Sequence, residues 1–263
     1  MAIDFIIGYD CVPKRVLTDA GIQERLKANE RAQLIIRLYR EAGDDRPPSQ
    51  MGFELTHRTP QGETTELIVV QNLLDMAQPL TEHAHHCQGC PANRNNHAYG
   101  CMGFIQYPIS GQAERWLLNQ LPTQREALVY LLLKQGIDDF AYDGQTILPL
   151  RLNDVYFEER VPALRRLGEF DINANQVFEM IFGVGDVQPN HAAILLLFFN
   201  AIERDLQADE IMNLHPAPAD ADERFPFLHQ PMPQDDATTA ELKDFFHALY
   251  LAWRLGVALK VEA

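Results

Sequence analysis

Apolar residues in the N-terminal third of the chain follow strand and helix spacings in turn. The segment 1–8 is mainly apolar and predicts a first strand. From residue 22 to residue 39 apolar residues recur at spacings that fit one face of a helix, or of two joined helices. Apolar and polar residues alternate over 53–57 and resume over 64–71, on either side of a Pro-Gln-Gly turn. This pattern predicts a β-hairpin.

Helical signals dominate after a short apolar segment, 104–108, which predicts a further strand. Ser110 is placed to cap a helix that reaches Leu121. The sequence Thr123-Gln-Arg-Glu126 has the spacing of a capping box and predicts a helix that ends at Gly136. The segment 146–150 is interpreted as a strand, and a helix is expected between Asn173 and Gly183.

The C-terminal part of the pattern contains two further helices. Pro189 is suited to the first turn of an apolar helix that runs to about Leu206, and neighbours should cover that helix on several sides. A proline-rich and acidic stretch, about 207–237, predicts an extended connection. A second capping box, at 238–241, opens a terminal helix.

These elements predict an α+β protein with a small N-terminal sheet, a loop rich in Cys and His, and a mainly helical C-terminal half. We assign 1–109 to an α+β region that carries the loop at about 79–103, and 110–263 to a helical region that contains the connection 207–237. The two regions could also form one single domain. No repeat and no strict alternation of strands with helices supports a doubly wound sheet.

Composition and charge narrow the classes of partner and compartment. The 263 residues are 46% hydrophobic, which suffices for a substantial core, and 37 acidic against 22 basic residues give a net charge of -15. Such a charge repels polyanions, so we expect neither nucleic acid nor an anionic membrane as a partner. The longest apolar run, 192–199, is too short to cross a bilayer, and the N-terminus lacks the positive start of a secretory signal.

A cytoplasmic location is therefore expected, and there four cysteines favour metal over disulfides. Three histidines and two cysteines lie within 83–90, and Cys101 follows. Cys87-Gln-Gly-Cys90 has the spacing of a metal knuckle, and Cys101 lies between glycine-containing segments that allow the backbone to bend. Simple packing of buried thiols is the alternative, but few apolar residues surround the loop. The pattern predicts a zinc ion bound by Cys87, Cys90 and Cys101.

The fourth ligand of such a site stays open between a distant cysteine and two nearby histidines. Cys11 lies after the first strand and is the remaining cysteine of the chain. His86 is favoured equally, although its side chain points away from that of Cys87 in an extended backbone. His85 points to the same side as Cys87 in that geometry, so it is retained as a third candidate.

The predicted function is that of a metal-binding protein, with structural zinc and a binding or regulatory role, because a closed four-ligand site has no position for a substrate. The alternatives are an iron–sulfur or thiol redox sensor, and a metal-dependent enzyme with an open coordination position. The sequence leaves open whether the chain is an enzyme. It identifies no protein or small-molecule partner and allows a homo-oligomer.

Other candidate groups are isolated. His191 at the start of the apolar helix and His247 in the terminal helix are interpreted as capping or core residues, because a lone histidine seldom acts without a partner. The acidic pairs 138–139 and 158–159 are typical of a solvated face. No Walker loop, nucleophile elbow or dinucleotide fingerprint occurs in the sequence.

Overall fold

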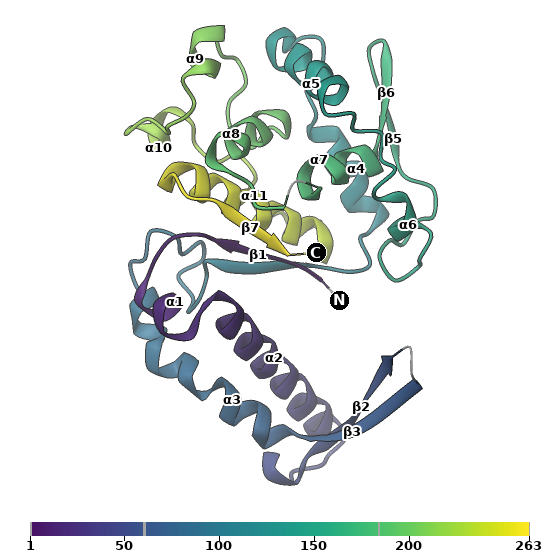
Figure 1. Cartoon of the computed structure of the whole chain (residues 1–263), viewed down its shortest axis with the longest axis vertical. Coiled ribbons are helices and arrows are strands. Elements are labelled where there is room, and N and C mark those ends of the chain that lie inside the picture. Colours follow the sequence, from purple (N-terminus) through teal and green to yellow (C-terminus); the bar gives the residue numbers. More distant parts are fainter. Residues whose placement is uncertain (1, 60–61, 184, 263) are drawn as a thin grey trace. The chain divides into compact units, whose positions relative to one another are not determined.

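The computed structural model describes residues 2–59, 62–183 and 185–262. The chain divides into two compact units. The larger unit comprises Met1–Tyr9, Pro91–Asn95 and Gly100–Ala263, and the smaller unit comprises Asp10–Cys90 and Asn96–Tyr99. Helices and small antiparallel sheets are combined within the described residues, which confirms the α+β class. Each unit is described by itself below (Figure 1).

The smaller unit is built on two helices and a hairpin. The two long helices are α2 (Asp19–Glu41) and α3 (Val70–His83), and strands β2 (Gly52–Thr59) and β3 (Gly62–Val69) lie between them in the sequence. The short helix α1 (Val12–Leu17) precedes α2, and the short helix η2 (Ala84–Cys87) follows α3. Thr18 caps α2 by accepting a hydrogen bond from the Gly21 amide at 3.1 Å. Ala28 and Ala32 of α2 pack with Val70 and Leu73 of α3 in a common core. Figure 1 shows the two helices side by side, with the predicted hairpin at one end.

The larger unit contains a three-stranded antiparallel sheet. Strand β1 (Ala2–Ile7) lies between β4 (Met102–Gln106) and β7 (Leu259–Glu262), so the two ends of the chain are hydrogen-bonded to each other. Helix α11 (Ala237–Leu255) packs against all three strands. The rings of Phe5 and Phe245 meet edge to face, with centroids 5.3 Å apart. The first strand was predicted, whereas β7 was not.

The other elements of the larger unit are mainly helical. They are α4 (Gly111–Gln120), α5 (Ala127–Asp139), α6 (Leu148–Arg151), β5 (Leu164–Leu167), β6 (Phe170–Asn173), α7 (Ala174–Phe182), α8 (Pro189–Phe198), α9 (Ala208–Met212) and α10 (Ala221–Arg224). Ser110 caps α4 and Pro189 opens α8, as their sequence positions predicted. Asn173 lies at the predicted start of α7, where it forms a capping box with Gln176. No helix in the described ranges is long and apolar enough to span a membrane.

Several local predictions differ from the structure. The segment 146–150 is not a strand, because Leu148–Arg151 forms α6 with a proline in its first turn. Helix α5 begins at Ala127, passes through Gly136 and ends at Asp139. Helix α8 was expected to reach about Leu206, but it ends at Phe198 and a turn follows at residues 199–200. The stretch 207–237 forms two short helices and packs side chains such as Leu214 and Phe225 into the core.

A buried ion pair joins three separate segments of the larger unit. The side chains of Arg151 and Glu114 are both fully buried and form an ion pair. Arg151 also donates to the Asn175 side chain at 2.8 Å and to the Glu159 carbonyl at 2.9 Å, and its guanidinium lies 3.9 Å from the centre of the Phe157 ring. Because both charges are removed from water, their mutual contacts must offset a large desolvation cost.

We expect Arg151→Met to lower the free energy of unfolding by about 3–5 kcal/mol, because Glu114 then remains buried without its cation. Adding Glu114→Gln should recover part of this loss, since the amide oxygen can still accept from the Ala163 amide, now 2.9 Å from Glu114 Oε2. Urea unfolding followed by tryptophan fluorescence reports on this unit, which holds Trp116 and Trp253. Arg160→Met, at an exposed pair with Asp154, is the control. Equal losses at Arg151 and Arg160 would contradict the assignment.

His229 is a buried histidine whose protonation opposes folding. Its Nε2 donates to the Phe199 carbonyl at 2.8 Å, and its ring contacts those of Trp116 and Phe246. Burial lowers the pKa of His229 to about 4, and the cations Lys243 and Arg204 act in the same direction. The imidazole is therefore neutral in the folded protein at neutral pH.

We expect stability to fall as the pH decreases from about 6.5 to about 4, because the unfolded chain takes up the His229 proton first. Through His229 the free energy of unfolding decreases by about 2 kcal/mol at about pH 5, and it does not decrease above about pH 7. Urea unfolding of His229→Gln should show a smaller loss between these two pH values than the unchanged protein. His215→Gln alters an exposed histidine of the same unit and should keep the full loss. An unchanged pH dependence in His229→Gln would refute this account.

Candidate ligand-binding pocket

The predicted metal ligands do not come together as a site. Cys87 is buried, Cys11 and Cys90 are half-buried, and these three belong to the smaller unit, whereas the buried Cys101 belongs to the larger one. His86 is exposed, and its ring lies 3.9 Å from that of His85, whose Nδ1 is 3.0 Å from the Glu82 carbonyl. In the described part of the chain, no group of three or more His, Cys, Asp or Glu side chains is arranged to hold a metal ion.

The predicted function, metal binding with a binding or regulatory role, is therefore wrong. The alternatives that need a metal centre rest on the same cluster, which the described residues do not form, and none of the four cysteines forms a disulfide. Closeness along the sequence did not produce a metal site, because the rings of His85 and His86 lie against each other on the exposed side of η2, whereas Cys87 is buried. The pKa of Cys87 is raised, chiefly by burial, which favours the neutral thiol.

Ordinary protein contacts hold the loop instead. The Tyr99 amide donates to Cys87 Sγ at 3.2 Å, and the Tyr99 hydroxyl donates to the Leu80 carbonyl at 2.7 Å. In the larger unit, Arg94 donates to Asp244 of α11 at 3.0 Å and to the Met102 carbonyl at 2.8 Å. These contacts account for the order of the loop through hydrogen bonds and one ion pair.

A pocket of about 540 Å³ lies among α5, α7 and α8 of the larger unit. Leu132, Gln135, Gly136 and Asp139 line it at spacings of three and four, so they form one face of α5. His191, Ile194 and Phe198 line it in the same way from α8, and the other lining residues are Phe140, Tyr142, Met180, Gln188 and Asn190. The size and mainly apolar lining are typical of small-molecule sites.

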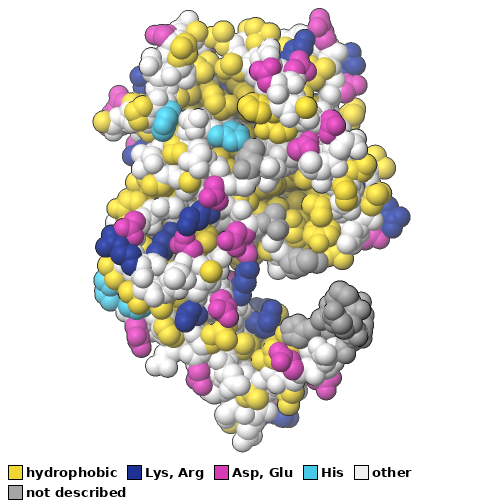
Figure 2. All heavy atoms as spheres, viewed as in Figure 1, with side chains coloured by type: hydrophobic (Ala, Val, Ile, Leu, Met, Phe, Trp, Pro, Cys, Tyr) yellow, Lys and Arg dark blue, Asp and Glu magenta, His cyan; other side chains and the backbone are white. Residues whose placement is uncertain are grey.

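The apolar character extends to the surface around the pocket. Leu131 and Phe140 are exposed by 58% and 72%. In the face drawn in Figure 2, apolar side chains are visible over the end of the larger unit where Figure 1 shows α5 and α8. An exposed apolar area beside a cavity is a feature of binding surfaces.

The imidazole of His191 is the polar group of the pocket best placed to hydrogen-bond to a ligand. It is half-buried at the first turn of α8, and burial lowers the pKa of its imidazole. Among the residues that the structure describes, none hydrogen-bonds to this ring. A neutral imidazole has one donor and one acceptor, and both are left for a ligand.

The charge of the pocket disfavours anionic ligands. Asp139 is its one charged lining residue, and the Gln135 amide donates to the Asp139 carboxylate at 2.6 Å. No Lys or Arg lines the described pocket. An anion would therefore meet repulsion there without a compensating cation, whereas an uncharged molecule would not.

Comparisons of the chain with protein-family models, with curated proteins and with solved structures found no match. The geometry of the pocket is therefore the basis for a functional assignment. The sequence singled out His191 but assigned it to a structural role, and it did not identify the apolar residues around it. Their helical spacing was visible, but the pairing of α5 with α8 depends on tertiary packing.

Proposed function

We propose that the protein binds a small, uncharged and mainly apolar molecule in the pocket among α5, α7 and α8, and that His191 hydrogen-bonds to its polar group. The observation that carries this proposal is the imidazole of His191, with a lowered pKa and no hydrogen-bond partner among the described residues, in a mainly apolar pocket. Buried polar groups are normally hydrogen-bonded, so a ligand that supplies the partner gains affinity.

The apolar walls supply most of the binding free energy. Burial of apolar surface contributes about 25 cal/mol per Å², and Met180, Ile194 and Phe198 offer such surface along the pocket. The imidazole contributes less, about 1 kcal/mol for a hydrogen bond between neutral groups, but it selects among apolar ligands. Affinity and selectivity thus come from different side chains.

Binding is favoured over catalysis by the surroundings of His191. A catalytic imidazole is usually oriented by a second group, such as a carboxylate, and acts on a nucleophile or a bound water. Burial is the cause of the lowered pKa of His191, and no neighbouring charge contributes to it. The arrangement is that of a recognition group.

Gly136 allows the pocket to be filled without disturbing the fold. Apart from its chain neighbours and the backbone of its own helix, a Cβ atom at Gly136 would have no atom within 4 Å, and the residue is in α5. We expect Gly136→Leu to weaken the binding of the neutral probe Nile red at least about tenfold, because the new side chain occupies the space of the ligand. Probe fluorescence in a titration of the protein measures this effect.

Gly136→Ala is the matched control, because it removes the same glycine but adds one methyl group. It should retain probe binding and stabilise α5 by up to about 1 kcal/mol. Equal binding by the unchanged protein and Gly136→Leu, with both variants folded, would place the probe elsewhere and refute the proposed pocket.

The role of His191 is tested by comparing naphthalene with 2-naphthol, which differ by one hydroxyl group. We expect the naphthol to bind about fivefold more tightly than naphthalene, the factor expected of one neutral hydrogen bond. In His191→Leu this preference should disappear while naphthalene still binds. Competition with Nile red gives both affinities. A preference that persists in His191→Leu would exclude the imidazole as the recognition group.

A further inference from the structure

A second pocket of the larger unit has a very different lining. It has a volume of about 330 Å³ and lies between the loop before α5 and the β5–β6 hairpin. Arg125, Arg165 and Arg166 line it, together with Thr123, Gln124 and Gly168. Three arginine residues in the lining of one small pocket are a concentration of positive charge in a chain with a net charge of -15.

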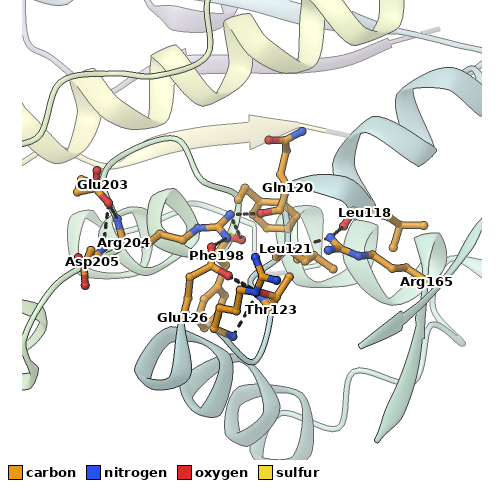
Figure 3. A network of polar contacts seen from close by, with 12 residues as sticks. Leu118, Gln120, Leu121, Thr123, Glu126, Arg165, Phe198, Glu203, Arg204 and Asp205 are labelled. Carbon is orange, nitrogen blue, oxygen red and sulfur yellow. Dashed lines mark hydrogen bonds and ion pairs between the residues drawn. The ribbon is translucent and has the colours of Figure 1, made fainter. Parts of the chain in front are cut away.

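Arg165 is fixed by backbone contacts. Its Nη1 donates to the Leu118 carbonyl and, at 3.1 Å, to the Leu121 carbonyl, at the C-terminal end of α4 (Figure 3). Carbonyl groups satisfy two donor positions but do not neutralise the charge. Arg165 therefore remains a positioned cation with further N–H groups available.

Arg204 holds the loop 123–125, which lines the other side of the pocket, through contacts outside the pocket. This buried side chain donates to the Gln120 carbonyl, to the Phe198 carbonyl at 3.3 Å and to Glu126 Oε1 at 3.0 Å (Figure 3). The second oxygen of Glu126 accepts from the amide and the hydroxyl of Thr123, both at 2.7 Å. The carboxylate of Glu126 is thus hydrogen-bonded to Arg204 and Thr123. Its charge also acts on Arg165, but the charge of Arg204 offsets it.

The hairpin turn approaches the loop closely at Gly168. This residue has a φ of +60°, and a Cβ atom there would lie 2.3 Å from Gln124 Nε2. The Tyr130 hydroxyl of α5 donates to the Leu167 carbonyl at 3.1 Å and holds the two segments together. The walls of the pocket are therefore fixed relative to each other by the fold.

The charges around the pocket do not cancel. Asp171 Oδ1 lies 3.3 Å from Arg166 Nη1, so the carboxylate offsets one of the three arginine charges. The guanidinium of Arg125 has no hydrogen-bond partner in the described part of the chain. Two positive charges remain in excess, beside the start of α5, where the N-terminal amides have no side-chain cap.

We propose that this pocket binds the phosphoryl group of a small phosphate monoester. The excess of two positive charges matches a phosphate dianion, and guanidinium groups form paired hydrogen bonds with its oxygens. The volume of the pocket accommodates a small ligand, and the overall negative charge of the chain opposes a polyanion such as a nucleic acid. This site is separate from the apolar pocket, whose lining lacks cations.

The test is calorimetric titration of the full chain with glycerol 2-phosphate, with inorganic phosphate and with acetate, at constant ionic strength. We expect both phosphates to bind and acetate to bind at least about tenfold more weakly, because a monoanion pairs with fewer donors. In the double variant Arg125→Gln/Arg166→Gln phosphate affinity should fall at least about tenfold. Arg165 is left unchanged because it also holds the end of α4.

Arg160→Gln is the control for lost surface charge, since Arg160 is exposed and paired with Asp154 rather than placed in the pocket. It should retain phosphate binding, and thermal melting should show that all variants are folded. No binding of either phosphate at millimolar concentrations would overturn the proposal. So would equal affinities for phosphate and acetate, or equal losses in the double variant and Arg160→Gln.

Discussion

The pairing of β1 with both β4 and β7 is the constraint on which the larger unit depends. It joins residues 2–7 to residues 102–106 and 259–262 through backbone hydrogen bonds, so the start and the end of the chain become neighbours. The smaller unit is consequently an insertion between two adjacent strands of this sheet. Helix α11 packs on the sheet, α8 packs on α11, and α5 packs on α8. Helices α8 and α5, which line the apolar pocket, are thus positioned by the sheet through α11.

The two proposed sites share α5. The arginine-lined pocket lies at the loop that precedes this helix, and the apolar pocket lies along its later turns. Arg204 contacts residues next to both pockets. It donates to the carbonyl of Phe198, which lines the apolar pocket, and to Glu126, which holds the loop of the arginine-lined pocket. The chemical difference between the sites is one of charge, with arginines in one and a single aspartate in the other.

Several buried cations of the larger unit serve as tertiary connections. Arg94, Arg151, Arg204 and Lys243 each bind one carboxylate and at least one backbone carbonyl. Each cation joins segments that lie apart in the sequence, by as much as 150 residues for Arg94 and Asp244. Because an unpaired buried charge is very costly, such groups favour one arrangement of the segments over others. Among them, Arg204 holds the loop that lines the arginine pocket through Glu126.

The sequence by itself determined those features that depend on neighbouring residues. The caps at Ser110 and Asn173, the proline at the start of α8 and the alternation in the hairpin specify local hydrogen bonds and local burial. Only the tertiary structure decided that Leu259–Glu262 pairs with β1, that α5 and α8 line a common pocket, and that Arg125 and Arg165 line another. It also decided that Cys87 and Cys101 belong to different units. The physical reason is range: capping and alternation act over a few residues, whereas the position of a side chain in a site depends on the packing of segments far apart in the chain.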